Sequence, residues 1–173
     1  MAGAEKGRGA GAAGRLCTVG IAKDYLSFSA AHFTIFSGDR RENLHGHNFA
    51  VQGRATGRVG ENGLTFDYEL LKSKIGELCA GLDEKLLLPS GSPHLDIRGG
   101  PGEVEVRFAE ERMHFLERDV LLIPVANVTV EELSGWFLDL LLADGDIEAL
   151  DLEELEVRVS SGPGQWGISR WRR

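Results

Sequence analysis

The sequence LHGHNF, residues 44–49, places two of the chain's five histidines on either side of a single glycine. A third, His32, lies thirteen residues before His45, in the sequence SFSAAHF at residues 27–33. Alternate side chains of a β-strand project from the same face, so a strand that begins at His45 directs His45 and His47 the same way. If the strand that ends at His32 pairs with it, the three imidazoles come together.

Three such imidazoles form a donor set that suits a metal ion. Three neutral histidines at about 2.0–2.1 Å from Zn²⁺, with a fourth position open, are typical of a catalytic zinc site. The alternative is that His45 and His47 are simply half-buried strand residues, because short motifs often occur by chance. His32 on the neighbouring strand favours the metal. His94 and His114 fall in a predicted loop and an exposed hairpin, so both are expected on the surface.

The whole chain has the size of one domain. Its 173 residues suffice for a single core, and we expect residues 1–15, which are rich in Gly and Ala, to be a disordered tail before one domain at 16–173. The net charge of −8 argues against nucleic acid or an acidic membrane as the main partner. No apolar run approaches the roughly 18 residues of a membrane span. Cys17 and Cys79 lack metal-type spacing and are expected as reduced thiols in a cytoplasmic protein.

The hydrophobic pattern predicts an α+β fold with an antiparallel sheet. Strands are expected at residues 18–32, 45–59, 103–108, 112–116, 119–125 and 155–161, and after a turn the segment 162–171 is expected to return as a further strand. One helix is expected over 66–82, with Asp67 near its N-terminus. Another should begin after Thr129, three residues before Glu132, the spacing of a capping box. Residues 89–102 are expected to form a loop.

Five segments carry a family resemblance: FSAAHF (28–33), LHGHNF (44–49), GLTFDYELLK (63–72), LDEKLLLP (82–89) and NVTVEEL (127–133). From about Val19 to its end, the chain resembles the 6-pyruvoyl-tetrahydropterin synthase and 6-carboxytetrahydropterin synthase family. The resemblance implies a tunnelling fold, in which an antiparallel sheet carries two helices on one face. It also implies homotrimers or homohexamers that form through sheet edges, with active sites between subunits. Zinc on His32, His45 and His47 is the cofactor that it implies.

The first departure from the family pattern concerns its catalytic cysteine, which precedes the HGH segment. The sequence GDRRENLHGH, residues 38–47, contains no cysteine, and Glu42 gives it the ExxHGH pattern of a subgroup associated with cleavage of the side chain of dihydroneopterin-type substrates. A carboxylate beside a metal-bound hydroxyl can move a proton when its pKa suits the task. The alternative is that Glu42 is one solvated charge in a loop.

Two further departures concern the base and the pterin contact. The family's Leu-Asp-His reads Leu82-Asp83-Glu84, so Asp83 and Glu84 either share the work of the missing histidine or are exposed charges after a helix. A family glutamate that grips the pterin falls at Ser160 or Ser161, and serine lacks a bidentate carboxylate.

Thr129 and Glu131 match the family's T-x-E segment and are candidate ligand contacts, although capping explains Thr129 equally well. Trp166 lies near the missing glutamate and is a candidate to line an altered pocket together with Ser161. Trp136 lies on the apolar stripe of its helix and is expected in the core.

The leading functional prediction is a zinc-dependent lyase or aldolase that acts on the side chain of a (dihydro)neopterin-type substrate. Glu42, Asp83 and Glu84 would handle protons. Retro-aldol cleavage fits better than phosphate elimination, because the thiol associated with elimination is absent. One alternative is a diverged zinc enzyme that acts on a non-pterin hydroxy-carbonyl or aldehyde compound. Another is a non-catalytic subunit stabilised by zinc.

Overall fold

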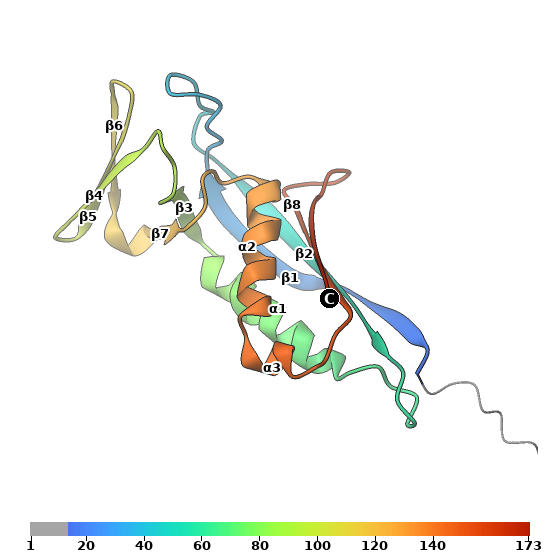
Figure 1. The fold of residues 1–173 in the computed structure, drawn as a ribbon. Helices are drawn as coiled ribbons and strands as arrows, with labels where there is room; N and C mark the ends of the chain where they lie inside the picture. The colour runs from blue at the N-terminus through green and yellow to red at the C-terminus, as the bar shows by residue number, and fades with distance from the viewer. Residues whose placement is uncertain (1–13) are drawn as a thin grey trace, which may run out of the picture.

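The computed structural model describes residues 14–173 (Figure 1). A six-stranded sheet carries its helices on one face, and a three-stranded sheet lies to one side of it. The strands of the main sheet are, in sheet order, β7 (Val120–Ile123), β3 (Lys85–Pro89), β1 (Leu16–His32), β2 (His45–Arg58), β8 (Glu154–Ser160) and β9 (Gly167–Arg172). The helices are α1 (Tyr68–Leu82), α2 (Val130–Leu142) and the short α3 (Gly145–Glu148). The predicted α+β class with two main helices on one face is therefore confirmed.

A long antiparallel hairpin, β1–β2, forms the centre of the sheet. Its register pairs Leu16 with Arg58 at one end and His32 with His45 at the other, with an irregularity between Ala22 and Ser27. The two faces differ because side chains alternate along each strand. The helix-facing side of the hairpin is apolar and buried, whereas the opposite side is polar. This alternation fixes the register that brings the histidines together.

The two main helices begin at the residues that the capping signals predict. The Asp67 carboxylate accepts a hydrogen bond from the amide of Glu69, and the Thr129 hydroxyl accepts one from the amide of Glu132. The Glu132 carboxylate does not close the capping box, because it accepts from the amide of Ala126 instead. Both helices bury their apolar faces against the sheet. The shared core includes Phe28, Phe49, Val51, Leu71, Ile75, Leu133, Phe137 and Val157.

The main sheet is mixed, whereas the sequence predicted an antiparallel one. Strand β3 is parallel to β1, and β7 is parallel to β3. The path of the chain explains both directions. Strand β2 runs back along β1 and α1 reverses the chain again, so β3 runs in the direction of β1. The long connection over residues 90–119 then lets β7 run parallel to β3. The parallel pairing of β1 with β3 is short and involves only Ala30 with Lys85 and Ala31 with Leu86.

The prediction of a loop over residues 89–102 was wrong in part, because residues 96–100 form a strand of the three-stranded sheet. Strand β4 (Asp96–Gly100) pairs with β5 (Glu103–Phe108), which pairs with β6 (Glu111–Leu116). Two glycines within β4 and the prolines on either side of it, Pro93 and Pro101, make this segment unlike a strand in local sequence, but pairing with β5 satisfies its backbone. A single-turn 3₁₀ helix (Glu117–Asp119) leads from this sheet to β7. The inner face of the small sheet packs on a second apolar cluster, which includes Phe33, Ile35, Leu88, Val106 and Phe108.

The first described residues lie beside the end of β2. Most of the expected tail, residues 1–13, lies outside the described residues, while Gly14 and Arg15 exchange backbone hydrogen bonds with Val59.

Cys17 is half-buried and Cys79 is buried, and both are free. Burial raises the pKa of Cys79 to about 12, so that thiol stays protonated. Among residues 14–173, no helix has the length and apolar character needed to cross a membrane.

Candidate active site

Three histidines converge where the β1–β2 hairpin ends. The ring centroid of His32 lies 4.7 Å from that of His45 and 5.3 Å from that of His47. One ring nitrogen from each residue lies within 4.8 Å of the other two. The Nε2 atoms of His45 and His47 are 3.1 Å apart. Two nitrogens bound to one tetrahedral zinc ion at about 2.1 Å would lie roughly 3.4 Å apart, so the spacing suits a shared ion.

The backbone sets the orientation of two of these rings. His32 Nδ1 lies 2.9 Å from the carbonyl oxygen of Val128, and His45 Nδ1 lies 2.8 Å from that of Asn43. A carbonyl oxygen can only accept, so each Nδ1 carries the proton and each Nε2 presents a lone pair. This arrangement is typical of histidines that bind metals through Nε2.

His32 supplies the strongest indication of a ligand. Its side chain is buried, and its Nε2 has no hydrogen-bond partner among the described residues. A buried polar atom without a partner is costly, and a metal ion would satisfy it. Burial lowers the pKa of His32, and the neighbouring His45 and His47 lower it further, against the hydrogen bond to Val128. The imidazole is therefore neutral, as a metal ligand must be. The donor set fits a metal ion.

Glu42 lies at the rim of this cluster. Its Oε2 atom is 3.9 Å from His45 Nε2 and accepts a hydrogen bond of 3.1 Å from the amide of Thr34. Its own amide donates to the carbonyl oxygen of Thr34 at 2.8 Å. Partial burial opposes ionisation, but the hydrogen bonds with Thr34 and the nearby histidines outweigh it and lower the pKa of Glu42. The carboxylate is therefore ionised near neutral pH and can accept a proton.

A cavity of about 400 Å³, here called the histidine pocket, opens beside the cluster. Its walls bring together eight residues that the sequence predicted: His32, Glu42, His45, His47, Thr129, Glu131, Ser161 and Trp166. The other residues that line it were not predicted as site residues: Thr34, Phe36, Phe49, Val130 and Gln165. An aromatic residue in an otherwise polar loop was the available signal for Phe36; no local pattern distinguishes Gln165.

The two serines at the end of β8 have different roles. Ser160 is buried, and its hydroxyl hydrogen-bonds with the backbone of Gly162 in the turn that follows. Ser161 lines the histidine pocket, and its hydroxyl lies 3.4 Å from the side-chain nitrogen of Gln165. The pocket therefore presents a hydroxyl and an amide at the place where the resemblance implied a carboxylate.

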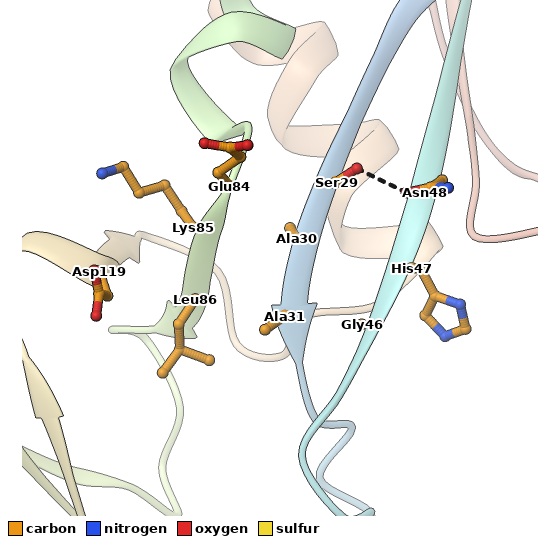
Figure 2. Close-up of a pocket in the computed structure, with 10 residues that line it drawn as sticks. All are labelled: Ser29, Ala30, Ala31, Gly46, His47, Asn48, Glu84, Lys85, Leu86 and Asp119. Carbon is orange, nitrogen blue, oxygen red and sulfur yellow. Dashed lines mark hydrogen bonds between the residues drawn. The ribbon is translucent and has the colours of Figure 1, made fainter.

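Asp83 and Glu84 do not reach the histidine pocket. Asp83 Oδ1 accepts a hydrogen bond of 2.7 Å from the amide of Ser29, and this contact ties the end of α1 to β1. Glu84 lines a different cavity of about 480 Å³, here called the Glu84 pocket, together with Lys85 and Asp119. His47 also lines this cavity, although Figure 2 shows that its imidazole is directed away from Glu84 and Lys85. Glu84 has a φ of 58°, a left-handed conformation that is strained for a residue with a side chain.

Gly167, the first residue of β9, lets that strand approach the first turn of α2. A Cβ atom at this position would lie 2.1 Å from the carbonyl oxygen of Val130 and 2.7 Å from the amide nitrogen of Glu131. Real atoms cannot approach so closely, so only glycine allows the contact. The approach places Trp166 and Glu131 on the wall of the same pocket.

Known proteins resemble this chain in sequence and in fold. The model of a family described as "6-pyruvoyl tetrahydropterin synthase" matches residues 21–170. A candidate 6-carboxy-5,6,7,8-tetrahydropterin synthase of Methanocaldococcus jannaschii is 27% identical over 148 residues, which cover 84% of this chain and 90% of that protein. A second one, from Pyrococcus abyssi, is 25% identical over 137 residues, which cover 79% of this chain and 80% of that protein.

Among solved structures, 6-pyruvoyl tetrahydropterin synthase from Plasmodium vivax superposes with a TM-score of 0.86 at 28% identity, covering 92% of this chain and 99% of that one. The same enzyme from Plasmodium falciparum gives a TM-score of 0.85 at 28% identity, covering 91% and 99%. Two further Plasmodium vivax structures, with TM-scores of 0.86, are variants of a catalytic residue in which a glutamate is replaced by alanine or by cysteine.

Proposed function

Because the chain belongs to the 6-pyruvoyl tetrahydropterin synthase family, we propose that it is a zinc-dependent lyase that cleaves the side chain of a (dihydro)neopterin-type substrate. Family membership supports an enzyme of pterin biosynthesis. The convergence of three histidines and Glu42 on one pocket supports the proposed metal, substrate and reaction.

Zinc is the proposed ion because the donors are three neutral imidazoles. His32, His45 and His47 would hold it through Nε2, and the histidine pocket leaves room for substrate beside them. When bound, the ion would supply a Lewis acid for adjacent oxygens of the substrate side chain. The chain itself contributes the orientation of the rings, through the carbonyl groups of Val128 and Asn43.

Glu42 is the proposed proton acceptor. Its carboxylate is ionised and lies beside the histidine cluster, which suits removal of a proton from a substrate hydroxyl as the neighbouring carbon–carbon bond breaks. The same carboxyl group can return that proton to the carbon that remains on the ring. A catalytic glutamate in the Plasmodium vivax relative supports a role of this kind. Glu42 and Glu131 are the two glutamates that line the histidine pocket, and Glu42 is the one within 3.9 Å of a cluster histidine.

Asp83 and Glu84 can take part only if another copy of the chain brings them to the site. Within one chain they lie away from the histidine pocket, and Asp83 already binds the backbone of Ser29. A homotrimer or homohexamer that joins the Glu84 pocket of one copy to the histidine pocket of the next would complete the proton-transfer groups. We therefore propose an obligate homo-oligomer that acts on a small molecule in the cytoplasm.

Recognition of the pterin ring is assigned to the far wall of the pocket. Trp166 is 37% exposed there, and its indole can stack on a planar ring. The Glu131 carboxylate can accept two N–H groups of the pyrimidine edge, whereas Ser161 can offer one hydroxyl. The Thr129 hydroxyl is partly committed to the cap of α2. These four residues are the proposed substrate contacts.

Product analysis tests the proposal. Zinc-loaded protein is incubated with 7,8-dihydroneopterin, and the products are identified by mass spectrometry. We expect a pterin with a shortened side chain together with a small carbonyl fragment, and no product after chelation. Unchanged dihydroneopterin in the presence of stoichiometric zinc would contradict the proposal.

One alternative has an observation in its favour. Ser161 stands where a carboxylate would grip the pterin, so the same metal site would then serve a non-pterin hydroxy-carbonyl or aldehyde substrate. Failure to bind pterin, together with zinc-dependent turnover of such a compound, would favour this alternative. Zinc-dependent turnover of any substrate would exclude a non-catalytic subunit that uses zinc only for stability.

A further inference from the structure

The three-stranded sheet β4–β5–β6 contacts the loop that carries Glu42. Arg41, the residue before Glu42, lies close to two buried aromatic rings of the second apolar cluster. Its guanidinium carbon is 4.9 Å from the ring centroid of Phe33 and 5.8 Å from that of Phe108, the last residue of β5. A guanidinium within about 6 Å of an aromatic centroid is attracted by the ring.

The hydrogen bonds of Arg41 join the small sheet to the candidate active site. Arg41 Nε donates to Glu111 Oε2 at 2.8 Å, and Nη2 contacts the same oxygen. Arg41 Nη1 donates to the backbone carbonyl oxygen of Glu42 at 2.8 Å. The side chain of Arg41 is only 14% exposed, although that of Glu111, the first residue of β6, is 56% exposed. A lysine could not make these contacts together, because it lacks the planar array of donors.

These contacts hold Glu42 from both sides of its backbone. Its amide is bonded to Thr34, which lies just after β1, and its carbonyl group is bonded to Arg41. With both peptide groups fixed, the side chain keeps the direction in which Oε2 meets the Thr34 amide and lies near His45. Misplacement of a catalytic group by about 1 Å can reduce a rate strongly, so such a support matters for the chemistry.

We propose that Arg41 is a positioning residue, through which the small sheet holds the Glu42 carboxylate against the histidine cluster. This role of Arg41 rests on the proposed function of Glu42. It also gives the three-stranded sheet β4–β6 a part in positioning the candidate active site. Arg41 itself touches no reacting atom in this scheme. Its partner Glu111 acts one step further from the site, by holding the guanidinium.

Amide hydrogen exchange tests the geometry without any substrate. Arg41→Met and Glu111→Gln are compared with Glu110→Gln, an exposed neighbour in the β5–β6 turn. In the first two variants we expect exchange at the Glu42 amide to rise about tenfold or more, while the amides of β5 keep their protection. Unchanged exchange at Glu42 would overturn the proposal. An equal rise throughout β5 would also overturn it, because a merely structural clamp would loosen the whole small sheet.

Kinetics with 7,8-dihydroneopterin provide the second readout. In Arg41→Met and Glu111→Gln we expect kcat to fall about tenfold, with KM and zinc stoichiometry unchanged. Full kcat in these variants, when Glu42→Gln is inactive, would overturn the role of Arg41 and leave the proposed function intact. Full kcat in Glu42→Gln would instead overturn the proposed role of Glu42 in proton transfer, and the exchange result alone would then decide whether Arg41 holds this loop. Absence of turnover in the unchanged, zinc-loaded protein is the outcome that would overturn the proposed function. If Arg41→Met does not fold, Glu111→Gln decides both readouts.

Discussion

His32 and His45 face each other as a register pair at the end of the β1–β2 hairpin, with ring centroids 4.7 Å apart. Their Nδ1 atoms are both engaged by backbone carbonyl groups, so both Nε2 atoms are directed to the same region. A pairing register that is fixed by the apolar face of the sheet thus also fixes the candidate metal centre.

Removal of one imidazole should abolish metal binding. We expect purified His45→Ala to retain less than about a tenth of the zinc of the unchanged protein, because two histidines cannot close the site. His94→Ala is the matched control, since His94 is exposed and lies outside the cluster. Elemental analysis after dialysis measures the stoichiometry. Full zinc content in His45→Ala would disprove the site.

Glu42→Gln should separate metal binding from turnover. The amide keeps the shape of the side chain but cannot accept the proton, so we expect zinc content to be unchanged and kcat to fall about 10²-fold or more. The measurement is the steady-state rate with 7,8-dihydroneopterin. Turnover equal to that of the unchanged protein would make Glu42 an ordinary loop charge.

Glu84→Gly should increase stability, because glycine adopts the left-handed conformation at φ 58° without strain. We expect a gain of about 1 kcal/mol in the free energy of unfolding, measured by urea denaturation. Glu84→Ala is the control: it removes the carboxylate and keeps the strain. If a neighbouring copy uses this carboxylate, both variants lose activity and only Glu84→Gly gains stability. Unchanged activity in both would remove Glu84 from the proposed mechanism.

Glu156 should stabilise the fold in a pH-dependent way. Its buried carboxylate, on the open face of the sheet, meets Arg54, Arg158 and Arg170. Burial opposes ionisation, but the hydrogen bonds from Arg158 and Arg170 outweigh it and lower the pKa of Glu156 below its ordinary value of 4.5. A lowered pKa means that this stabilisation is present above pH 4.5 and is lost as the pH falls through the folded-state value.

The variant Glu156→Gln measures that contribution. We expect it to lose about 2 kcal/mol of unfolding free energy at pH 7, less than for a wholly buried pair because Arg54 and Arg170 are 46% and 44% exposed. The difference from the unchanged protein should shrink below pH 4.5. A difference that stays constant from pH 7 to pH 3 would show that the charge of Glu156 plays no part.

The parts of the site that were predictable follow from local rules. The alternation of side chains in a strand placed His45 and His47 on one face, and the capping signals placed Asp67 and Thr129 at helix starts. Both rules depend on residues close together in the chain. The family resemblance added residues from distant segments, and the structure brings Glu131, Ser161 and Trp166 to the same pocket as the histidines.

The parts that were missed depend on long-range pairing. Strand β4 has the local composition of a loop and is a strand only because β5 lies beside it. The parallel direction of β3 follows from the path of the chain through α1, which no local pattern records. Asp83 and Glu84 come directly after α1, and their sequence does not show toward which pocket they are directed. Only the structure shows that they lie away from the histidine pocket. Gln165 lies in the connection between β8 and β9, and it lines the histidine pocket only because of how the fold places this connection.

A fluorescence titration of neopterin against metal-verified protein, with and without zinc, tests directly whether the histidine pocket binds a pterin. We expect micromolar binding that disappears on chelation and in His45→Ala but persists in His94→Ala. Binding that is absent at millimolar neopterin, with zinc present at one ion per chain, would contradict the claim that this pocket accepts a pterin.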